Sequence, residues 1–257
     1  MAIYLDAILE RHREVAAADT RSLDILLSEA RDQPPARGFR DALAASPKLS
    51  VISEIKRRSP SKGDLNAGLD PAEIARTYER GGAACLSVLT DVDFFGGSVA
   101  DLQTARTACS LPVIRKDFTV CSHDVADARI MGADCLLLIA AALAPSELAE
   151  LHALATDIGL DVLVEIHDET ELEVALAAEA TLVGVNQRDL VTFEVDHDRA
   201  VRVGKIIPDT VVRVAESGVR HADDAHALHA AGFDAVLVGE TLVTSSDPAA
   251  AIAAMIR

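Results

Sequence analysis

Short apolar runs alternate with longer helix-like segments over most of the chain. An amphipathic stretch over 3–18 and a second helix-like stretch before Pro34-Pro35 come first, and the β-rich runs follow. There are eight runs: LSVISEI (49–55), ACLSVLT (84–90), PVIRK (112–116), DCLLLIA (134–140), DVLVEI (161–166), TLVGVN (181–186), TVVRVAE (210–216) and DAVLVG (234–239). Each is short and largely apolar, which is typical of strands buried on both faces of a parallel sheet.

The segments between these runs carry apolar residues at helical spacing and are rich in Ala, Leu, Glu and Arg. They cover 71–80, 98–109, 123–131, 145–158, 169–178, 220–231 and 248–256. A glycine opens the tripeptides GAD (132–134), GLD (159–161) and GFD (232–234). A glycine in this place is typical of a helix C-cap that leads into the next strand.

This repeat predicts the α/β class and a (β/α)8 TIM barrel with an N-terminal helical extension. We expect a single barrel domain over 1–257, with residues 1–47 forming the extension. Such a barrel typically needs about 250 residues, which agrees with the length of 257. The alternative is an open doubly wound sheet, but no glycine-rich GxGxxG turn supports it.

Composition and charge narrow the possible partners. Half of the residues are hydrophobic and none is Trp, so the core must consist mostly of Ala, Val, Leu and Ile. The formal net charge of −17 repels nucleic acid phosphates and anionic lipid, and we expect neither nucleic acid nor a membrane as a partner. No run reaches transmembrane length, and Asp6, Glu10 and Arg11 interrupt any signal-peptide core. We expect a cytoplasmic protein whose four scattered cysteines are inert thiols.

Polar side chains gather where the predicted strands end, which is where a (β/α)8 barrel places its active site. Glu54 and Lys56 are two residues apart and therefore lie on the same side of the first strand. A core-facing ion pair is the alternative interpretation of this couple. The ends of the later strands add Lys116, Glu165, Asn186, Glu216 and Ser217, with Gly239 after the last strand.

Convergence of Lys116, Glu165 and Glu216 on one ring disfavours a purely structural role, because several buried charges without a ligand are poorly compensated. Lys and Glu around one cavity can move one another's pKa toward neutrality, which suits acid–base catalysis. Of the five lysines, we place Lys56 and Lys116 inside the site. The others fall in loops or on a helix, at Lys48, Lys62 and Lys205.

Two glycines follow the seventh and eighth predicted strands, Gly218 in AESGV and Gly239 in LVGETL. This is the common phosphate position of the fold, where backbone N–H groups and a short helix N-terminus near Thr241 approach the oxygens. Each glycine alone is explained equally well by a turn, but the pair favours phosphate binding. We therefore expect a small-molecule sugar phosphate as the partner.

Two loops at the same end are candidates for contacts to the substrate. SPSKG (59–63) lacks the GxxxxGK[ST] spacing of a P-loop, and we interpret it as an active-site loop. DVDFFGGS (91–98) carries the adjacent aromatics Phe94 and Phe95 and is either a solvent-capping loop or an apolar wall for an aromatic substrate.

The histidines give weaker signals. His167 either orients Glu165 or lies in a surface loop. On one predicted helix the spacing of three histidines is not that of a metal site, so we expect no metal there: His221, His226 and His229.

Seven motifs resemble, in order, the successive motifs of the indole-3-glycerol phosphate synthase family. They are SEIKRRSPSKG (53–63), FFGGS (94–98), PVIRKDF (112–118), LVEIHDE (163–169), GVNQRDL (184–190), AESGV (215–219) and LVGETL (237–242). The N-terminal YLDAILERHREV is also similar to that family's helix before the first strand. The resemblance covers essentially the whole chain.

The resemblance implies ring closure of 1-(2-carboxyphenylamino)-1-deoxyribulose 5-phosphate to indole-3-glycerol phosphate, with loss of CO2 and water and without a cofactor. By motif position, Lys116 is the general acid that protonates the ribulose carbonyl oxygen. Glu165 and Glu54 are the carboxylates of later proton removal and dehydration. Lys56 binds the substrate carboxylate or phosphate and is a proton donor during dehydration.

The same motifs imply further contacts to the substrate. The residues are Ser59, Phe94, Phe118, Asn186, Arg188, Glu216, Ser217, Gly218, Leu237, Gly239 and Glu240. The resemblance assigns the anthranilate carboxylate and the hydroxyls to Asn186, Arg188, Glu216 and Ser217. It assigns the phosphate to backbone amides of Gly218, Gly239 and Glu240.

Gln187 stands where the family often has Asn, which puts any role of that side chain in doubt. With one barrel and no fused isomerase, we expect a monofunctional enzyme that is a monomer or a weak homo-oligomer. The alternatives are phosphoribosylanthranilate isomerase, a Schiff-base aldolase or a regulatory barrel without turnover. The pairing of Lys116 with Glu165 disfavours the last, because ligand binding alone needs no acid–base set.

Overall fold

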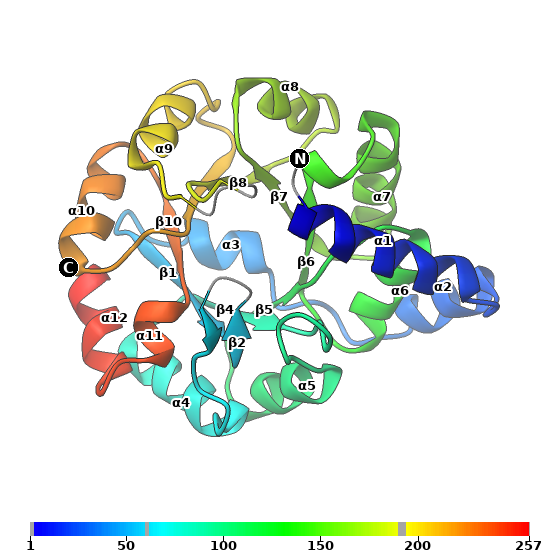
Figure 1. Cartoon of the computed structure of the whole chain (residues 1–257), viewed down its shortest axis with the longest axis horizontal. Helices are drawn as coiled ribbons and strands as arrows, with labels where there is room; N and C mark the ends of the chain where they lie inside the picture. Colours follow the sequence, from blue (N-terminus) through cyan, green and yellow to red (C-terminus); the bar gives the residue numbers. More distant parts are fainter. Residues whose placement is uncertain (1–2, 60–61, 190–193, 257) are drawn as a thin grey trace.

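Eight parallel strands close into a barrel at the centre of the molecule (Figure 1). They are β1 (Ser50–Ile55), β4 (Cys85–Leu89), β5 (Val113–Lys116), β6 (Cys135–Ile139), β7 (Asp161–Ile166), β8 (Leu182–Asn186), β9 (Val212–Glu216) and β10 (Ala235–Val238). The last strand closes the ring by pairing with the first, with Ser50 opposite Ala235. The predicted strands and the TIM barrel are confirmed, and the open doubly wound sheet is wrong.

The structure describes residues 3–59, 62–189 and 194–256. Pro60 and Ser61 of the predicted active-site loop lie outside these residues, as does Leu190 of the GVNQRDL motif. Within them, no helix has the length and apolar character needed to cross a bilayer.

The crossover helices form a ring outside the strands (Figure 1). They are α4 (Pro71–Gly81), α5 (Val99–Ala108), α6 (Ser122–Ile130), α7 (Pro145–Asp157), α8 (Glu169–Ala177), α9 (His197–Gly204), α10 (Ala222–Ala230) and α12 (Pro248–Ile256). The sequence pattern does not predict α9, because this short helix is mostly polar and buries few side chains, among them Ala200 and Val203. Its N-cap is nevertheless a strong local signal, since the Asp196 side chain accepts from two backbone N–H groups.

Three helices precede the barrel: α1 (Ile3–Ala18), α2 (Leu23–Arg31) and α3 (Phe39–Ala44). Only six residues long, α3 was not predicted, and in Figure 1 it lies at the centre of the ring of strands. Its Phe39 and Leu43 are fully buried, and the Leu43 carbonyl accepts from the Ser50 hydroxyl at the start of β1. The helix therefore covers the amino ends of the strands and leaves their carboxyl ends for a site.

Two of the three aspartates in the glycine-led tripeptides attach this segment to the barrel. Asp134 accepts from the backbone N–H of Arg37 at 2.8 Å, and Asp161 accepts from that of Arg40 at 2.9 Å. The preceding glycines, Gly132 and Gly159, have φ of +96° and +84°, which fits the predicted helix C-caps.

Short elements shape the loops at the carboxyl ends of the strands. An antiparallel hairpin of β2 (Arg58–Ser59) and β3 (Gly63–Asp64) follows β1, and the 3-10 helix η1 (Ala140–Ala142) follows β6. The four-residue α11 (Glu240–Val243) begins directly after β10 and is the short helix expected near Thr241.

Candidate active site

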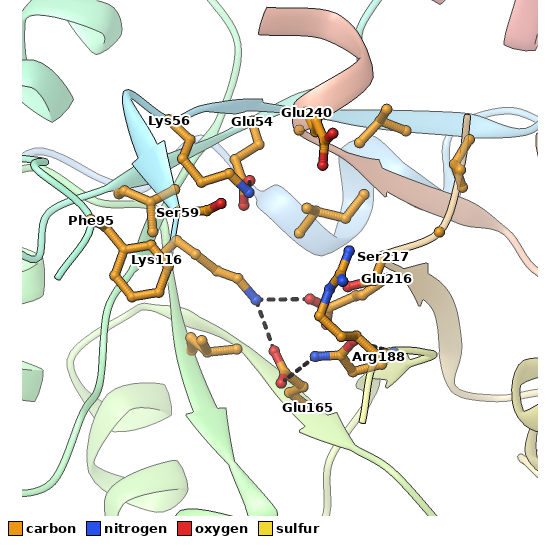
Figure 2. A pocket seen from close by; sticks show the side chains of 18 of the residues that line it. Glu54, Lys56, Ser59, Phe95, Lys116, Glu165, Arg188, Glu216, Ser217 and Glu240 are labelled. Carbon is orange, nitrogen blue, oxygen red and sulfur yellow. Dashed lines mark hydrogen bonds and ion pairs between the residues drawn. The ribbon is translucent and has the colours of Figure 1, made fainter. Parts of the chain in front are cut away.

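A cavity of about 900 Å³ opens at the carboxyl ends of the strands (Figure 2). It brings together nearly all of the predicted site residues, from strands spread over the whole chain. Those that line it are Glu54, Lys56, Ser59, Lys116, Phe118, Glu165, Asn186, Arg188, Glu216, Ser217, Gly218, Leu237, Gly239 and Glu240. Their placement follows from strand alternation, since polar side chains at the strand ends lie above inward-facing apolar ones such as Ile52 and Leu163.

Lys116 at the end of β5 lies between two carboxylates (Figure 2). Its Nζ donates to Glu165 Oε2 on β7 at 2.9 Å and to Glu216 Oε2 on β9 at 2.8 Å. The second oxygen of Glu165 accepts from Asn186 Nδ2 on β8 at 2.9 Å. Four strands thus supply one connected group of a cation, two carboxylates and an amide.

Burial and charge set the protonation of this group. Burial alone would lower the pKa of Lys116, but the charges of Glu165 and Glu216 outweigh it and raise that pKa, so the side chain is an ammonium. Burial would raise the pKa of Glu165, but Lys116 and Asn186 help to lower it to about 2. Burial raises the pKa of Glu216 to about 7, against the attraction of Lys116 and with the added repulsion of Glu165.

Glu216 takes up a proton more readily than Glu165, because its carboxylate has fewer hydrogen-bond and cationic partners. Its Oε1 is buried and has no hydrogen-bond partner, whereas both oxygens of Glu165 are bonded. Gly184 on β8 leaves the space for this oxygen, since a Cβ at that position would overlap the Glu216 carboxylate. Gly184 was not among the predicted site residues, although a glycine inside a strand is a signal of close approach.

Glu54 and Lys56 form a second ion pair across the cavity from Glu165 (Figure 2). Both line the cavity, and the predicted same-side placement is confirmed. Gly239 lies directly beside them, and a Cβ there would overlap Glu54 Oε1. With φ of −114°, Gly239 is not in a left-handed conformation, so the demand for glycine comes from the carboxylate of Glu54.

The turn after β9 has two residues with positive φ, Ser217 at +65° and Gly218 at +79°. Gln187 holds this turn, because its fully buried amide donates to the Ser217 carbonyl at 2.8 Å. The oxygen of the same amide lies 3.1 Å from Nδ1 of His197. The sequence analysis left Gln187 in doubt, and the structure gives it a positioning role in this turn.

The aromatic wall of the cavity contains Phe95 and not Phe94, which corrects the residue chosen from the sequence. The reason is the turn that carries both rings. Asp91 Oδ1 accepts from the backbone N–H groups of Phe94 at 2.6 Å and of Phe95 at 2.9 Å. With this turn, the ring centroid of Phe95 lies 6.3 Å from that of Phe118. Leu5 and Ile8 of α1 extend the apolar wall.

Lys62 is a second correction. It lines the cavity, although only Lys56 and Lys116 were expected inside the site. Its Nζ lies 3.5 Å from Glu240 Oε1 at the start of α11. Ser59 and Lys62, on either side of the β2–β3 hairpin turn, both line the cavity, as the predicted active-site loop requires.

His167 contacts Glu165 from the loop after β7. Its Nε2 lies 3.8 Å from Glu165 Oε1, and its Nδ1 lies 3.1 Å from Glu171 Oε2. Because the imidazole is largely buried beside the carboxylate, the orienting role is favoured over a surface position. On α10, His226 and His229 each bond to a backbone carbonyl.

Comparisons with known proteins agree with this geometry. A family model described as "Indole-3-glycerol phosphate synthase" matches residues 5–255. The chain is 52% identical over 223 residues to "Indole-3-glycerol phosphate synthase 2" of Streptomyces coelicolor, over 87% of this chain and 86% of that one. It is 47% identical over 247 residues to "Indole-3-glycerol phosphate synthase" of Bordetella pertussis, over 95% and 94% of the two chains.

Solved structures of distant sequence share the fold alone. A thiamine phosphate pyrophosphorylase from Pyrococcus furiosus superposes with a TM-score of 0.60 at 15% identity, over 81% of this chain and 94% of that one. An N-acetylmannosamine-6-phosphate 2-epimerase from Clostridium perfringens gives 0.60 at 14% identity, over 76% and 87%.

Proposed function

The chain belongs to the indole-3-glycerol phosphate synthase family, and from that premise we propose which of its residues perform each step. The reaction is the ring closure of 1-(2-carboxyphenylamino)-1-deoxyribulose 5-phosphate to indole-3-glycerol phosphate, a carboxy-lyase step of tryptophan biosynthesis. Family membership decides against the isomerase, aldolase and non-catalytic alternatives.

Lys116 is the general acid of ring closure. The ring carbon that bears the substrate carboxylate attacks the ribulose carbonyl carbon, and Lys116 Nζ protonates the carbonyl oxygen as the new C–C bond forms. Loss of CO2 then returns an electron pair to the ring. The ammonium between Glu165 and Glu216 supports this role, because a donor must carry its proton when the substrate binds.

Dehydration needs one proton donor and one proton acceptor. The hydroxyl made in the first step leaves as water, and the methylene carbon beside the nitrogen loses a proton to complete the indole. We assign proton removal to Glu165, which is ionised beside Lys116 and becomes a stronger base once that ammonium has given up its proton. We assign protonation of the leaving hydroxyl to the pair of Lys56 and Glu54 on the other side of the cavity.

The remaining residues hold the substrate. We assign the hydroxyls and the anthranilate carboxylate to Asn186, Arg188, Glu216 and Ser217, and the aromatic ring to Phe95 and Phe118 beside Leu237 and Ser59. The phosphate belongs at the turns after β9 and β10. Backbone N–H groups of Gly218, Gly239 and Glu240 would bind it, because the first N–H groups of α11 have no carbonyl one turn earlier.

We further propose a single barrel domain with an extension over 1–47, acting in the cytoplasm as a monomer or weak homo-oligomer on this phosphorylated small molecule. The single observation that supports the mechanism most is the contact of Lys116 with both Glu165 and Glu216 inside the cavity. The test is the ultraviolet absorbance of indole formation when purified protein meets the anthranilate-ribulose phosphate. An absent signal would refute the function, and a borohydride-trapped imine would indicate aldolase chemistry instead.

A further inference from the structure

His12 joins the N-terminal helix to the rim of the cavity. Its Nε2 lies 3.1 Å from Asp91 Oδ2, in the loop after β4, and 3.7 Å from Asp117 Oδ1, directly after β5. Its ring centroid lies 5.4 Å from that of Phe118. The His12 side chain is 17% exposed and both carboxylates are 5% exposed, so one imidazole ties three segments together out of bulk water.

Each of these carboxylates also fixes the backbone of an aromatic residue that lines the cavity. Asp91 Oδ1 accepts from the N–H of Phe95 at 2.9 Å, and Asp117 Oδ1 accepts from the N–H of Phe118 at 2.9 Å. Phe95 and Phe118 form the aromatic wall, and in Figure 2 Phe95 lies on the opposite side of the cavity from Ser217. A contact that holds both carboxylates therefore holds both rings.

The charges around His12 also bear on an anionic substrate. Asp91 and Asp117 line the cavity, Asp124 adds a third negative charge nearby, and Arg115 donates to Asp117 at 3.3 Å. Arg115 pairs with Asp117 and lies 4.0 Å from Asp124, and among the described residues His12 is the only cation paired with Asp91. The three carboxylates and two cations carry a net charge of −1 with the imidazolium and −2 without it, so loss of this cation increases the repulsion of the substrate carboxylate.

We propose that His12, as an imidazolium, is a positioning residue for the aromatic half of the substrate. It holds the loops of Phe95 and Phe118 against α1, and it neutralises the carboxylates of Asp91 and Asp117 that would repel anthranilate. This role rests on the proposed substrate and goes beyond the acid–base residues.

The contacts of His12 determine how substrate affinity should change with pH. Burial would lower the pKa of His12, but the hydrogen bond to Asp91 and the charges of Asp117, Asp91 and Asp124 raise it. The cation is therefore present below this raised pKa and is lost as the pH increases through it. Affinity for the aromatic half should fall over the same interval.

The test compares His12→Gln with His12→Lys, which keeps a cation, and with the control Arg11→Gln. Arg11 lies on the same helix and pairs with Asp93, but both side chains are more than half exposed. We expect His12→Gln to raise the KM for the anthranilate-ribulose phosphate about tenfold or more at pH 6, with kcat changed about twofold at most. His12→Lys should restore KM and remove its pH dependence, and Arg11→Gln should match the wild type.

Binding of two parts of the substrate, free anthranilate and inorganic phosphate, distinguishes this role of His12 from an effect on folding and from failure of the proposed reaction. Binding of free anthranilate should weaken in His12→Gln, whereas inhibition by inorganic phosphate should not change. Loss of both ligands together with a lower melting temperature would show a general structural role of α1 and overturn the proposal. Failure of His12→Lys to restore anthranilate binding would also overturn the proposal. So would loss of anthranilate binding when the wild type is treated with a chelator, because that result would indicate a metal ion. If the wild type does not turn over the substrate, the proposed function fails, while anthranilate binding still tests His12.

Discussion

Lys116 compensates two buried carboxylates, so its replacement affects stability as well as catalysis. We predict that Lys116→Met lowers kcat about 10²–10⁴-fold, the range for a positioned proton donor. Without the ammonium, the pKa of Glu165 is no longer held low, and two buried carboxylates repel each other. The variant should therefore lose more stability at pH 8 than at pH 5, where a proton replaces the lost charge.

Indole formation and melting curves at both pH values check this prediction. Activity within a few-fold of the wild type would remove Lys116 from the mechanism. A loss of stability that does not depend on pH would show that Glu165 and Glu216 are not the groups left uncompensated.

The pKa of Glu216 is raised, whereas that of Glu165 is lowered, so the two carboxylates contribute to stability with opposite pH dependence. Its folded pKa of about 7 lies above the ordinary 4.5, so the folded state binds an extra proton between these values. The stability from this group is fully present below 4.5 and is lost as the pH rises through about 7. The side chain of Glu216→Gln is always neutral, so at pH values above 7 this variant should melt at a higher temperature than the wild type. Each kcal/mol gained in the free energy of unfolding corresponds to about 2–4 °C.

The same variant should match the wild type near pH 4 and bind substrate less well. Exposed Glu173 on α8 offers a control, since Glu173→Gln should change neither the melting temperature nor its pH dependence. An equal gain at pH 4 and pH 8 would contradict the raised pKa.

At the scale of elements, the turn after β10 contacts the end of β1, so a substitution at Gly239 affects both the proposed phosphate site and Glu54. A side chain there intrudes on the proposed phosphate position and also overlaps the carboxylate of Glu54. We predict that Gly239→Val raises KM sharply, weakens inhibition by inorganic phosphate and lowers kcat at least about tenfold.

Gly68→Val is a matched control, because a Cβ at Gly68 meets no atom within 4 Å. Steady-state kinetics with and without phosphate separate the two effects. An unchanged KM and phosphate inhibition would place the phosphate elsewhere, and an unchanged kcat would exclude Glu54 from the dehydration step.

At the scale of the whole molecule, the net charge of −17 works against the compact state. The Debye length, over which charges still repel each other, falls from about 30 Å at 0.01 M salt to about 3 Å at 1 M. Added salt should therefore relieve the repulsion between carboxylates. We predict that NaCl between these concentrations raises the melting temperature by about 2–5 °C at pH 8. The rise should shrink at pH 5, where carboxylates begin to protonate, and an equal rise at both pH values would mean that acidic self-repulsion is not the cause.

The sequence by itself determined the elements and the end of the barrel that carries the chemistry. Burial on both faces makes each strand a continuous apolar run, and the glycine caps mark where helices end, so both signals are local. Alternation with a period of two put Glu54 and Lys56 on one side of β1 without any knowledge of their neighbours. The same local signals did not predict α3 and α9, because both helices are short and α9 is mostly polar.

Only the tertiary structure decided which of these side chains touch. Lys116 meets Glu165 and Glu216 from positions 49 and 100 residues away, a contact set by the register of a closed ring. Phe95 rather than Phe94 faces the cavity because Asp91 fixes the turn, and Gly184 is required because the carboxylate of Glu216 lies against it. His12 gave no signal in the sequence, because its partners Asp91 and Asp117 come 79 and 105 positions later. Distances across the barrel depend on how all eight strands close, and no local pattern of residues contains that information.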